Sequence, residues 1–460
     1  MPDPQPLPPV AGPPVLATEE PPAHSRLLSA LAGVVALVVL GSVAFYWFGA
    51  ADGSLPGSAA ATPTLGDATT PVVDAGDRDD ALLVLLAERA TAVMRQDSAG
   101  FLASVDPLAA DFAAAQSRLA RRLERVPFAA WSYRVVGEGP GLAEDVAAAL
   151  PEGSSIVRVR LTYRLDGTIT DTDRDQYLTV VPRGGRWLLA GDTDAGPSGF
   201  ETQRDLWDLG NVRVVRGEHS IVVGDVRAAD RPAMRSLVRE ADLAVADVDR
   251  VWEAEWSRRP VILLPASQQD MATLIGSDGD ELAQIAAVTT GAFEEGVSRG
   301  DRIVVNPATF DTLGTLGRRV VLTHEMTHVA TRATSVLPVP IWLSEGFADY
   351  VAYEATSVPT AIVAGDVLDD VRDGRGPERL PETADFDAGT GDIAAAYEGA
   401  WLAARLIADR YGERRLVALH VALGDSVGPG WPEETVDVLG ISSRRLERMW
   451  LGHLEKVAQR

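Results

Sequence analysis

Two short segments carry most of the information in this chain. Residues 324–328 read His-Glu-Met-Thr-His, and residues 342–350 read Trp-Leu-Ser-Glu-Gly-Phe-Ala-Asp-Tyr. Side chains four positions apart lie on one face of a helix, so His324 and His328 can present two imidazoles to one metal ion. Glu345 can supply a third ligand from the next helix, which leaves one coordination position open. The spacing therefore predicts two helices that meet at a metal site.

The alternative is a helix whose two His and one Glu merely face solvent. Three observations favour the metal site. The chain has only six His, and two of them are here. Residues 318–332 contain no Gly or Pro, as a continuous helix requires. Residues 337–340 read Leu-Pro-Val-Pro, which ends one helix and starts another before Glu345.

The two segments together resemble the gluzincin metallopeptidases of the thermolysin and aminopeptidase-N type, and in particular the peptidase MA-like domain. The resemblance implies one zinc ion per chain, with His324, His328 and Glu345 as its ligands. It implies Glu325 as the base that activates a zinc-bound water to hydrolyse a peptide bond. It also implies that Asp349 hydrogen-bonds the first His ligand. An exposed helix acid is the alternative for Asp349.

Tyr397 is the candidate for a hydrogen-bond donor to the developing oxyanion, because gluzincins carry a Tyr or His donor downstream of the third ligand. The alternative is a Tyr ring that packs on a neighbouring helix. Zinc is inferred from the ligand types, and imidazole with carboxylate also accepts cobalt or manganese.

Residues 291–295 read Gly-Ala-Phe-Glu-Glu, which is similar to the Gly-x-Met-Glu-Asn segment of the aminopeptidases in this clan. Two positions differ from that segment, and we predict an acidic turn here. A strand over residues 302–306 follows. In the fold that the resemblance implies, an edge strand beside the metal helix binds the substrate backbone, and we assign this role to residues 303–305.

The N-terminal part of the chain predicts a membrane anchor. Residues 27–49 are an uncharged apolar run long enough to span a bilayer, preceded by Arg26. The positive-inside rule then places a Pro-rich tail, residues 1–26, in the cytoplasm and the rest of the chain outside the cell membrane. A cleaved signal peptide is the alternative. Residues 50–78 are rich in Ala, Gly, Thr and Pro and predict a flexible linker.

Composition excludes several classes of function. A net charge of −24 argues against binding to nucleic acid. The chain has no Cys, so thiolate metal sites, Cys nucleophiles and disulfides are excluded. We expect a peptide or protein as the substrate, and the sequence carries no signal for an oligomeric state.

The remainder predicts an α+β fold in two domains. Residues 79–204 read as an accessory α+β domain, with helices over 81–95 and 109–126 followed by four strands, and weakly resemble the curved-sheet folds of the nuclear-transport-factor-two type. Residues 205–460 read as the peptidase MA-like domain, which would have a sheet lobe and a helical lobe. We predict long helices over 231–256, 393–411 and most of 436–457.

Two functions follow from these observations. The first is a membrane-anchored zinc peptidase. The second is a non-catalytic extracytoplasmic binding module that zinc stabilises, and an intact Glu325 argues against it because a structural site needs no base. A further hypothesis is that residues 79–200 restrain the peptidase as a built-in inhibitor.

Overall fold

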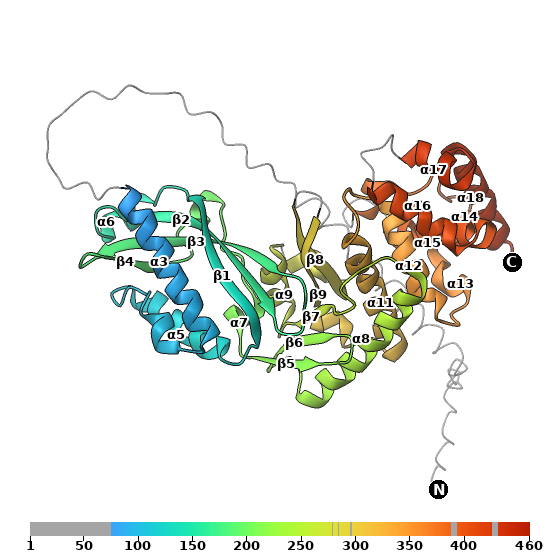
Figure 1. The fold of residues 1–460 in the computed structure, drawn as a ribbon. Helices are drawn as coiled ribbons and strands as arrows, with labels where there is room; N and C mark the ends of the chain where they lie inside the picture. Colours follow the sequence, from blue (N-terminus) through green and yellow to red (C-terminus); the bar gives the residue numbers. More distant parts are fainter. Residues whose placement is uncertain (1–74, 278, 284, 295–296, 388–392, 426–430) are drawn as a thin grey trace, which may run out of the picture.

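The computed structural model describes residues 75–277, 279–283, 285–294, 297–387, 393–425 and 431–460. It has a four-stranded sheet, a five-stranded sheet and a group of C-terminal helices (Figure 1). The predicted α+β class is confirmed. The predicted tail, membrane span and nearly all of the linker lie outside the described residues. Within the described residues, no helix is long and apolar enough to cross a membrane.

The four-stranded sheet is antiparallel in the order β1-β2-β3-β4, with α3 and α5 packed against it. In β2, buried Val159, Leu161 and Tyr163 alternate with Arg and Thr side chains, because successive residues of a strand point to opposite faces. The elements are α3 (Ala75–Met94), α4 (Ser98–Leu102), α5 (Ala110–Leu123), β1 (Phe128–Glu138), α6 (Glu144–Ala149), β2 (Ser155–Leu165), β3 (Thr172–Arg183), β4 (Arg186–Gly191) and η1 (Gly196–Ser198).

Helix α3 begins earlier than the sequence predicts. Residues 75–78, predicted as the end of the linker, form its first turn. Arg78 is held there because its guanidinium pairs with Glu138 on β1. Local composition does not reveal a tertiary contact of this kind. The predicted boundary between the linker and the first helix therefore lies too late in the chain.

The five-stranded sheet has the order β5-β6-β7-β9-β8. Strands β6, β7 and β9 run parallel, and β5 and β8 pair antiparallel at the two edges. Parallel neighbours need long crossovers, which α8 and the segment containing α9 supply. The elements are α7 (Leu206–Leu209), β5 (Val212–Arg216), β6 (Ile221–Asp225), α8 (Arg231–Val251), β7 (Val261–Leu264), α9 (Gln268–Ile275), η2 (Gly279–Leu282), β8 (Ala287–Glu294) and β9 (Val297–Val305).

Both faces of the five-stranded sheet are buried. Ile303 and Val305 lie in the core with α8 and α11, whereas Val304 lies in a second core with α9 and the four-stranded sheet. Strands covered on both faces read as continuous apolar runs, and the Ile-Val-Val run of β9 is such a case.

Two predictions about this sheet are wrong. Strand β9 lies between β7 and β8, so residues 303–305 are not an edge strand. Residues 291–294 are the end of edge strand β8 and not an acidic turn. The β-branched run Val288-Thr289-Thr290 lies in the first half of this strand, and pairing with β9 extends the strand through the residues that we predicted as a turn.

The remaining helices carry the metal-ligand candidates and form the C-terminal lobe (Figure 1). Helix α8 ends at Val251, before the predicted end, and the predicted helix over 436–457 is two helices with Gly440 at a positive φ of 70° between them. The elements are α10 (Pro307–Phe310), α11 (Thr315–Arg332), α12 (Ile341–Glu354), α13 (Thr360–Val363), α14 (Gly365–Arg372), η3 (Thr383–Phe386), α15 (Ile393–Tyr411), α16 (Glu413–Asp425), α17 (Trp431–Leu439) and α18 (Ser443–Ala458).

A buried ionic network joins the two sheets. Arg302 on β9 donates to Asp205 and, at 2.7 Å, to the hydroxyl of Tyr163 on β2. The Tyr163 hydroxyl donates to Asp205 at 2.8 Å, and Arg174 on β3 donates to the same carboxylate. Asp205 and Arg302 are only 2% and 4% exposed, so solvent does not screen these charges. The predicted accessory domain is therefore fixed to the five-stranded sheet by charge as well as by a shared apolar core.

We predict that Asp205→Asn lowers the free energy of unfolding by about 3–5 kcal/mol, because it leaves two buried guanidinium groups without their carboxylate. Urea denaturation followed by circular dichroism measures the change. Asp373→Asn is the matched control: Asp373 pairs with Arg375 on the surface, and we expect little effect from its loss. Equal stabilities for the two variants would contradict the prediction.

Candidate metal centre

The metal-ligand candidates lie on two buried helices. From Gly317 to Thr331, nearly every residue of α11 is buried between the five-stranded sheet, α8 and α12. Helix α12 starts after Pro340 and is buried from Trp342 to Tyr353. A helix that is enclosed on all sides is normally apolar. Polar side chains inside α11 and α12 therefore need partners that offset their lost hydration.

His324, His328 and Glu345 converge on one point. Their donor atoms are 3.1 Å apart between the two Nε2 atoms, and 3.3 and 3.4 Å apart between Glu345 Oε2 and the Nε2 atoms of His324 and His328. Tetrahedral zinc with bonds of about 2.0–2.2 Å holds neighbouring donor atoms about 3.3–3.6 Å apart. The three separations fall near this range, so the cluster can hold a metal ion.

Glu345 supports the same conclusion. Its side chain is fully buried, and its Oε2 lies within 3.4 Å of the Nε2 atoms of both His324 and His328. Burial alone raises the pKa of Glu345, but the neighbouring His328 and His324 outweigh burial and lower this pKa to about 2. A buried ionised carboxylate is costly unless positive charge lies beside it, and a metal ion held by the two imidazoles would supply that charge.

Asp349 orients the first histidine. Its Oδ1 lies 2.8 Å from His324 Nδ1, and both side chains are buried. A carboxylate oxygen accepts, so the Nδ1–H of His324 donates to Asp349, and the Nε2 of His324 is the ring nitrogen that faces His328 and Glu345. Burial lowers the pKa of His324, and the carboxylates of Asp349 and Glu345 outweigh burial and raise it.

Glu325 lies beside the cluster and is held by a residue that the sequence analysis missed. The hydroxyl of Thr289 on β8 donates to Glu325 Oε2 at 2.7 Å and also lies 2.9 Å from the backbone oxygen of Glu325. Burial raises the pKa of Glu325. The only signal for Thr289 is its position in the run before Gly291, and that signal does not show which helix the strand faces.

Tyr397 on α15 is fully buried near the cluster. Its ring centroid lies 6.5 Å from that of His324, and Phe386 packs edge-on against the Tyr397 ring, with centroids 5.0 Å apart. The structure thus places Tyr397 against the first metal-ligand candidate, and its ring also packs on a neighbouring segment as the alternative expected. Sequence spacing could not distinguish a position near the ligand candidates from ring packing on a neighbouring segment, because Tyr397 has both.

Gly346 allows α12 and α15 to approach closely. A Cβ atom built at Gly346 would lie 2.3 Å from the backbone oxygen of Ala400. Glu345 precedes this contact on α12, and Tyr397 lies one turn before Ala400 on α15. The glycine therefore fixes the distance between the helix of the third ligand and the helix of Tyr397.

We predict that Gly346→Ala lowers the free energy of unfolding by about 1–3 kcal/mol, because α12 and α15 must move apart. Gly365→Ala is the control, since a Cβ at Gly365 would meet no atom within 4 Å. Thermal unfolding monitored by circular dichroism compares the two variants. A Gly346→Ala protein as stable as wild type would show that the contact is not tight.

His420 is a core residue outside the metal cluster. It is buried against Trp252 and Phe347, with ring centroids 5.4 and 5.0 Å away. Burial, helped by the charge of His328, lowers the pKa of His420 to about 3. The folded protein therefore keeps His420 neutral under conditions in which the unfolded chain binds a proton there.

This difference predicts a pH dependence of stability. Below the unfolded pKa of about 6.5, the unfolded chain binds one more proton than the folded protein. The contribution of neutral His420 is complete above pH 6.5 and is lost as the pH falls toward 3, by up to about 1.4 kcal/mol per pH unit. We expect the stability of wild type to fall more steeply than that of His420→Leu between pH 6.5 and 5 in urea titrations. Parallel curves would contradict the assignment.

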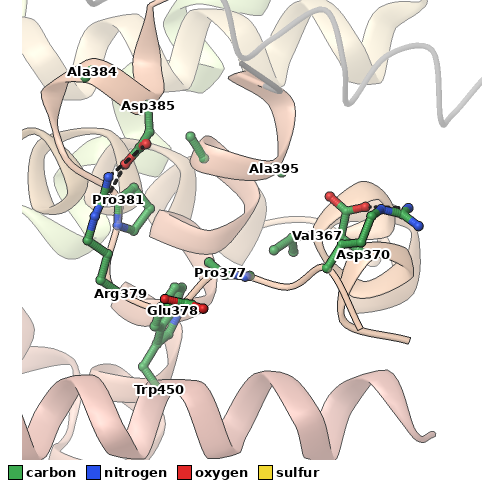
Figure 2. Close-up of a pocket in the computed structure, with 12 residues that line it drawn as sticks. Val367, Asp370, Pro377, Glu378, Arg379, Pro381, Ala384, Asp385, Ala395 and Trp450 are labelled. Carbon is green, nitrogen blue, oxygen red and sulfur yellow. Dashed lines mark hydrogen bonds and ion pairs between the residues drawn. The ribbon is translucent and has the colours of Figure 1, made fainter. Parts of the chain in front are cut away.

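A cavity of about 690 Å³ lies elsewhere, in the C-terminal lobe (Figure 2). Its walls come from α14, the segment 375–385, the first turn of α15 and Trp450 of α18. The two arginines at its rim are already paired, Arg375 with Asp370 and Arg379 with Asp385. None of the metal-ligand candidates lines this cavity, so it is separate from the metal centre.

Neither a protein-family model nor a curated protein sequence matches this chain. The geometry of the site therefore carries the functional argument.

Proposed function

We propose that this chain is a zinc-dependent peptidase of the gluzincin type, with a peptidase MA-like domain over residues 205–460. The observation that carries the proposal is a three-donor cluster with a buried carboxylate, Glu325, beside it. Among the described residues the metal cluster consists of His324, His328 and Glu345 alone. Three protein ligands leave a fourth position for water or substrate, which is the arrangement of catalytic rather than structural zinc.

The donor set favours zinc. Calcium and magnesium take oxygen ligands, whereas two imidazoles and one carboxylate suit zinc and, with other geometries, cobalt or manganese. When bound, the zinc ion would polarise the scissile carbonyl and lower the pKa of a coordinated water to about 7.

The residues around the ion supply the remaining chemistry. Glu325 accepts a proton from the attacking water and delivers it to the leaving amine. Asp349 keeps His324 in the tautomer that ligates through Nε2. Tyr397 is the proposed hydrogen-bond donor to the carbonyl oxygen of the substrate, on which negative charge develops.

Strand β8 is the proposed support for the substrate backbone, in place of residues 303–305. In the described part of the chain, β8 pairs with a strand on one side only, and its Thr289 contacts Glu325. An extended peptide that pairs with the other side would run past the catalytic base. This geometry supports a peptide or protein substrate.

The second candidate is a binding module in which zinc is purely structural. One observation favours it: the three ligand candidates and Glu325 are at most 3% exposed, as in a closed site. The adjacent carboxylate of Glu325, and a set of three rather than four protein ligand candidates among the described residues, favour the peptidase. The proposed location is the cell membrane, through a single-pass anchor at residues 27–49, with the catalytic part outside; the apolar run in the sequence supports it.

We predict about one zinc per full-length chain by elemental analysis, lost in His324→Ala and kept in His219→Ala, since His219 is exposed and outside the cluster. Glu325→Gln should keep its zinc and lose about 10²–10⁴-fold in hydrolysis of a fluorescence-quenched peptide library. Wild-type hydrolysis by Glu325→Gln would exclude the assigned base. Bound zinc without any chelator-sensitive hydrolysis would favour the binding module.

A further inference from the structure

Thr289 is a buried strand residue that touches the proposed base. The residue is 4% exposed, and its hydroxyl oxygen lies 2.7 Å from Glu325 Oε2. The same oxygen lies 2.9 Å from the Glu325 backbone oxygen. One hydroxyl has one proton, and a carboxylate is the stronger acceptor of the two. The proton therefore lies chiefly between Thr289 and the Glu325 carboxylate.

We infer that Thr289 is a positioning residue whose hydroxyl holds the Glu325 carboxylate in the orientation that proton transfer requires. The inference rests on the proposed peptidase function. A base must lie within about 2.6–3.2 Å of the proton donor, and a Glu side chain has three rotatable bonds. The Thr289 hydroxyl occupies one carboxylate oxygen and leaves the other for the attacking water.

The strand that carries Thr289 is itself fixed. Thr289 is β-branched, which restricts its χ1 angle, and it pairs with Ile303 on the interior strand β9. Arg332, in the last turn of α11, donates to the backbone oxygen of Gly291 at 3.1 Å and pairs with Asp301 on β9. Strand β8 is thus tied to α11 at Thr289 and again two residues later.

The connection extends to the four-stranded sheet. Thr290, next to Thr289, lies opposite Arg302 in the β8–β9 pair. Arg302 is the residue that Asp205 and Tyr163 bind in the buried network. The β8–β9 hairpin is therefore held by α11 and by the buried network around Asp205, close to the contact between the Thr289 hydroxyl and Glu325. A positioning residue needs such support to stay in one orientation.

A purely structural role would give Thr289 a different signature. If the hydroxyl only satisfied the Glu325 backbone oxygen, its loss would change stability and leave the turnover of the folded protein unaltered. If it positions the base, its loss lowers kcat while zinc content and KM stay unchanged. Serine, which keeps the hydroxyl, then restores kcat, whereas valine, which keeps only the shape, does not.

The test compares Thr289→Val and Thr289→Ser in the full-length zinc-loaded protein, with the best-cleaved peptide of the quenched library as the probe. We expect a loss of about 10–100-fold in kcat for valine and recovery of most of it with serine. Thr309→Val is the control, because Thr309 is similarly buried and donates to the backbone oxygen of Ala283. Wild-type kcat in Thr289→Val, or equal losses with valine and serine, would overturn the inference. Thr289→Ala replaces the valine variant if valine does not fold.

A second measurement does not depend on turnover. The free energies of unfolding of wild type, Thr289→Val, Glu325→Ala and the double variant form a double-mutant cycle. We expect the double variant to lose less than the sum of the two single losses, and additive losses would overturn the hydrogen bond. Glu325→Gln with wild-type hydrolysis would instead refute the proposed function, so the two failures are distinguishable.

Discussion

Five ionisable side chains are buried in the centre of the molecule, and this constraint shapes everything around them: His324, Glu325, His328, Glu345 and Asp349. Buried charges persist only when other groups offset their desolvation. The carboxylates of Glu345 and Asp349 contact His324, and Thr289 contacts Glu325. Glu345 is fully buried between His324 and His328, and a metal cation held by these three side chains would offset its negative charge.

The surrounding strands and helices hold these five side chains close to one another. The five-stranded sheet supplies Thr289 on one side of α11, and α12 supplies Glu345 and Asp349 on another. Gly346 determines how closely α15 packs against α12, and α15 carries Tyr397, whose ring lies near His324. The four-stranded sheet, which the sequence presents as a separate domain, shares an apolar core and a buried ionic network with the five-stranded sheet. Deleting it would expose that core, so a truncated chain is a poor test of whether it inhibits the rest.

Local patterns predicted the elements well where one physical rule dominates. Helical periodicity and flanking prolines placed α11 and α12, and the i, i+4 spacing put His324 and His328 on one face. Alternation placed β2. The predictions failed where tertiary pairing decides. Pairing with β9 carries β8 through Glu294, and β9 becomes an interior strand because it also pairs with β7, from which α9 and β8 separate it in the chain. The contact between Thr289 and Glu325 could not be predicted for the same reason, because the sequence around a strand does not show which helix packs against that strand.

The closeness in sequence of the site residues has a consequence for folding. Thr289, Glu325 and all three ligand candidates come from the β8–α12 stretch, and the His324–Asp349 contact closes a loop of only 25 positions. Short loops cost little entropy to close. Tyr397 arrives later, from the C-terminal lobe. We therefore expect a growing chain to bring all three ligand candidates together, and to be able to bind a metal ion there, before α15 and the later helices of the C-terminal lobe have been synthesised.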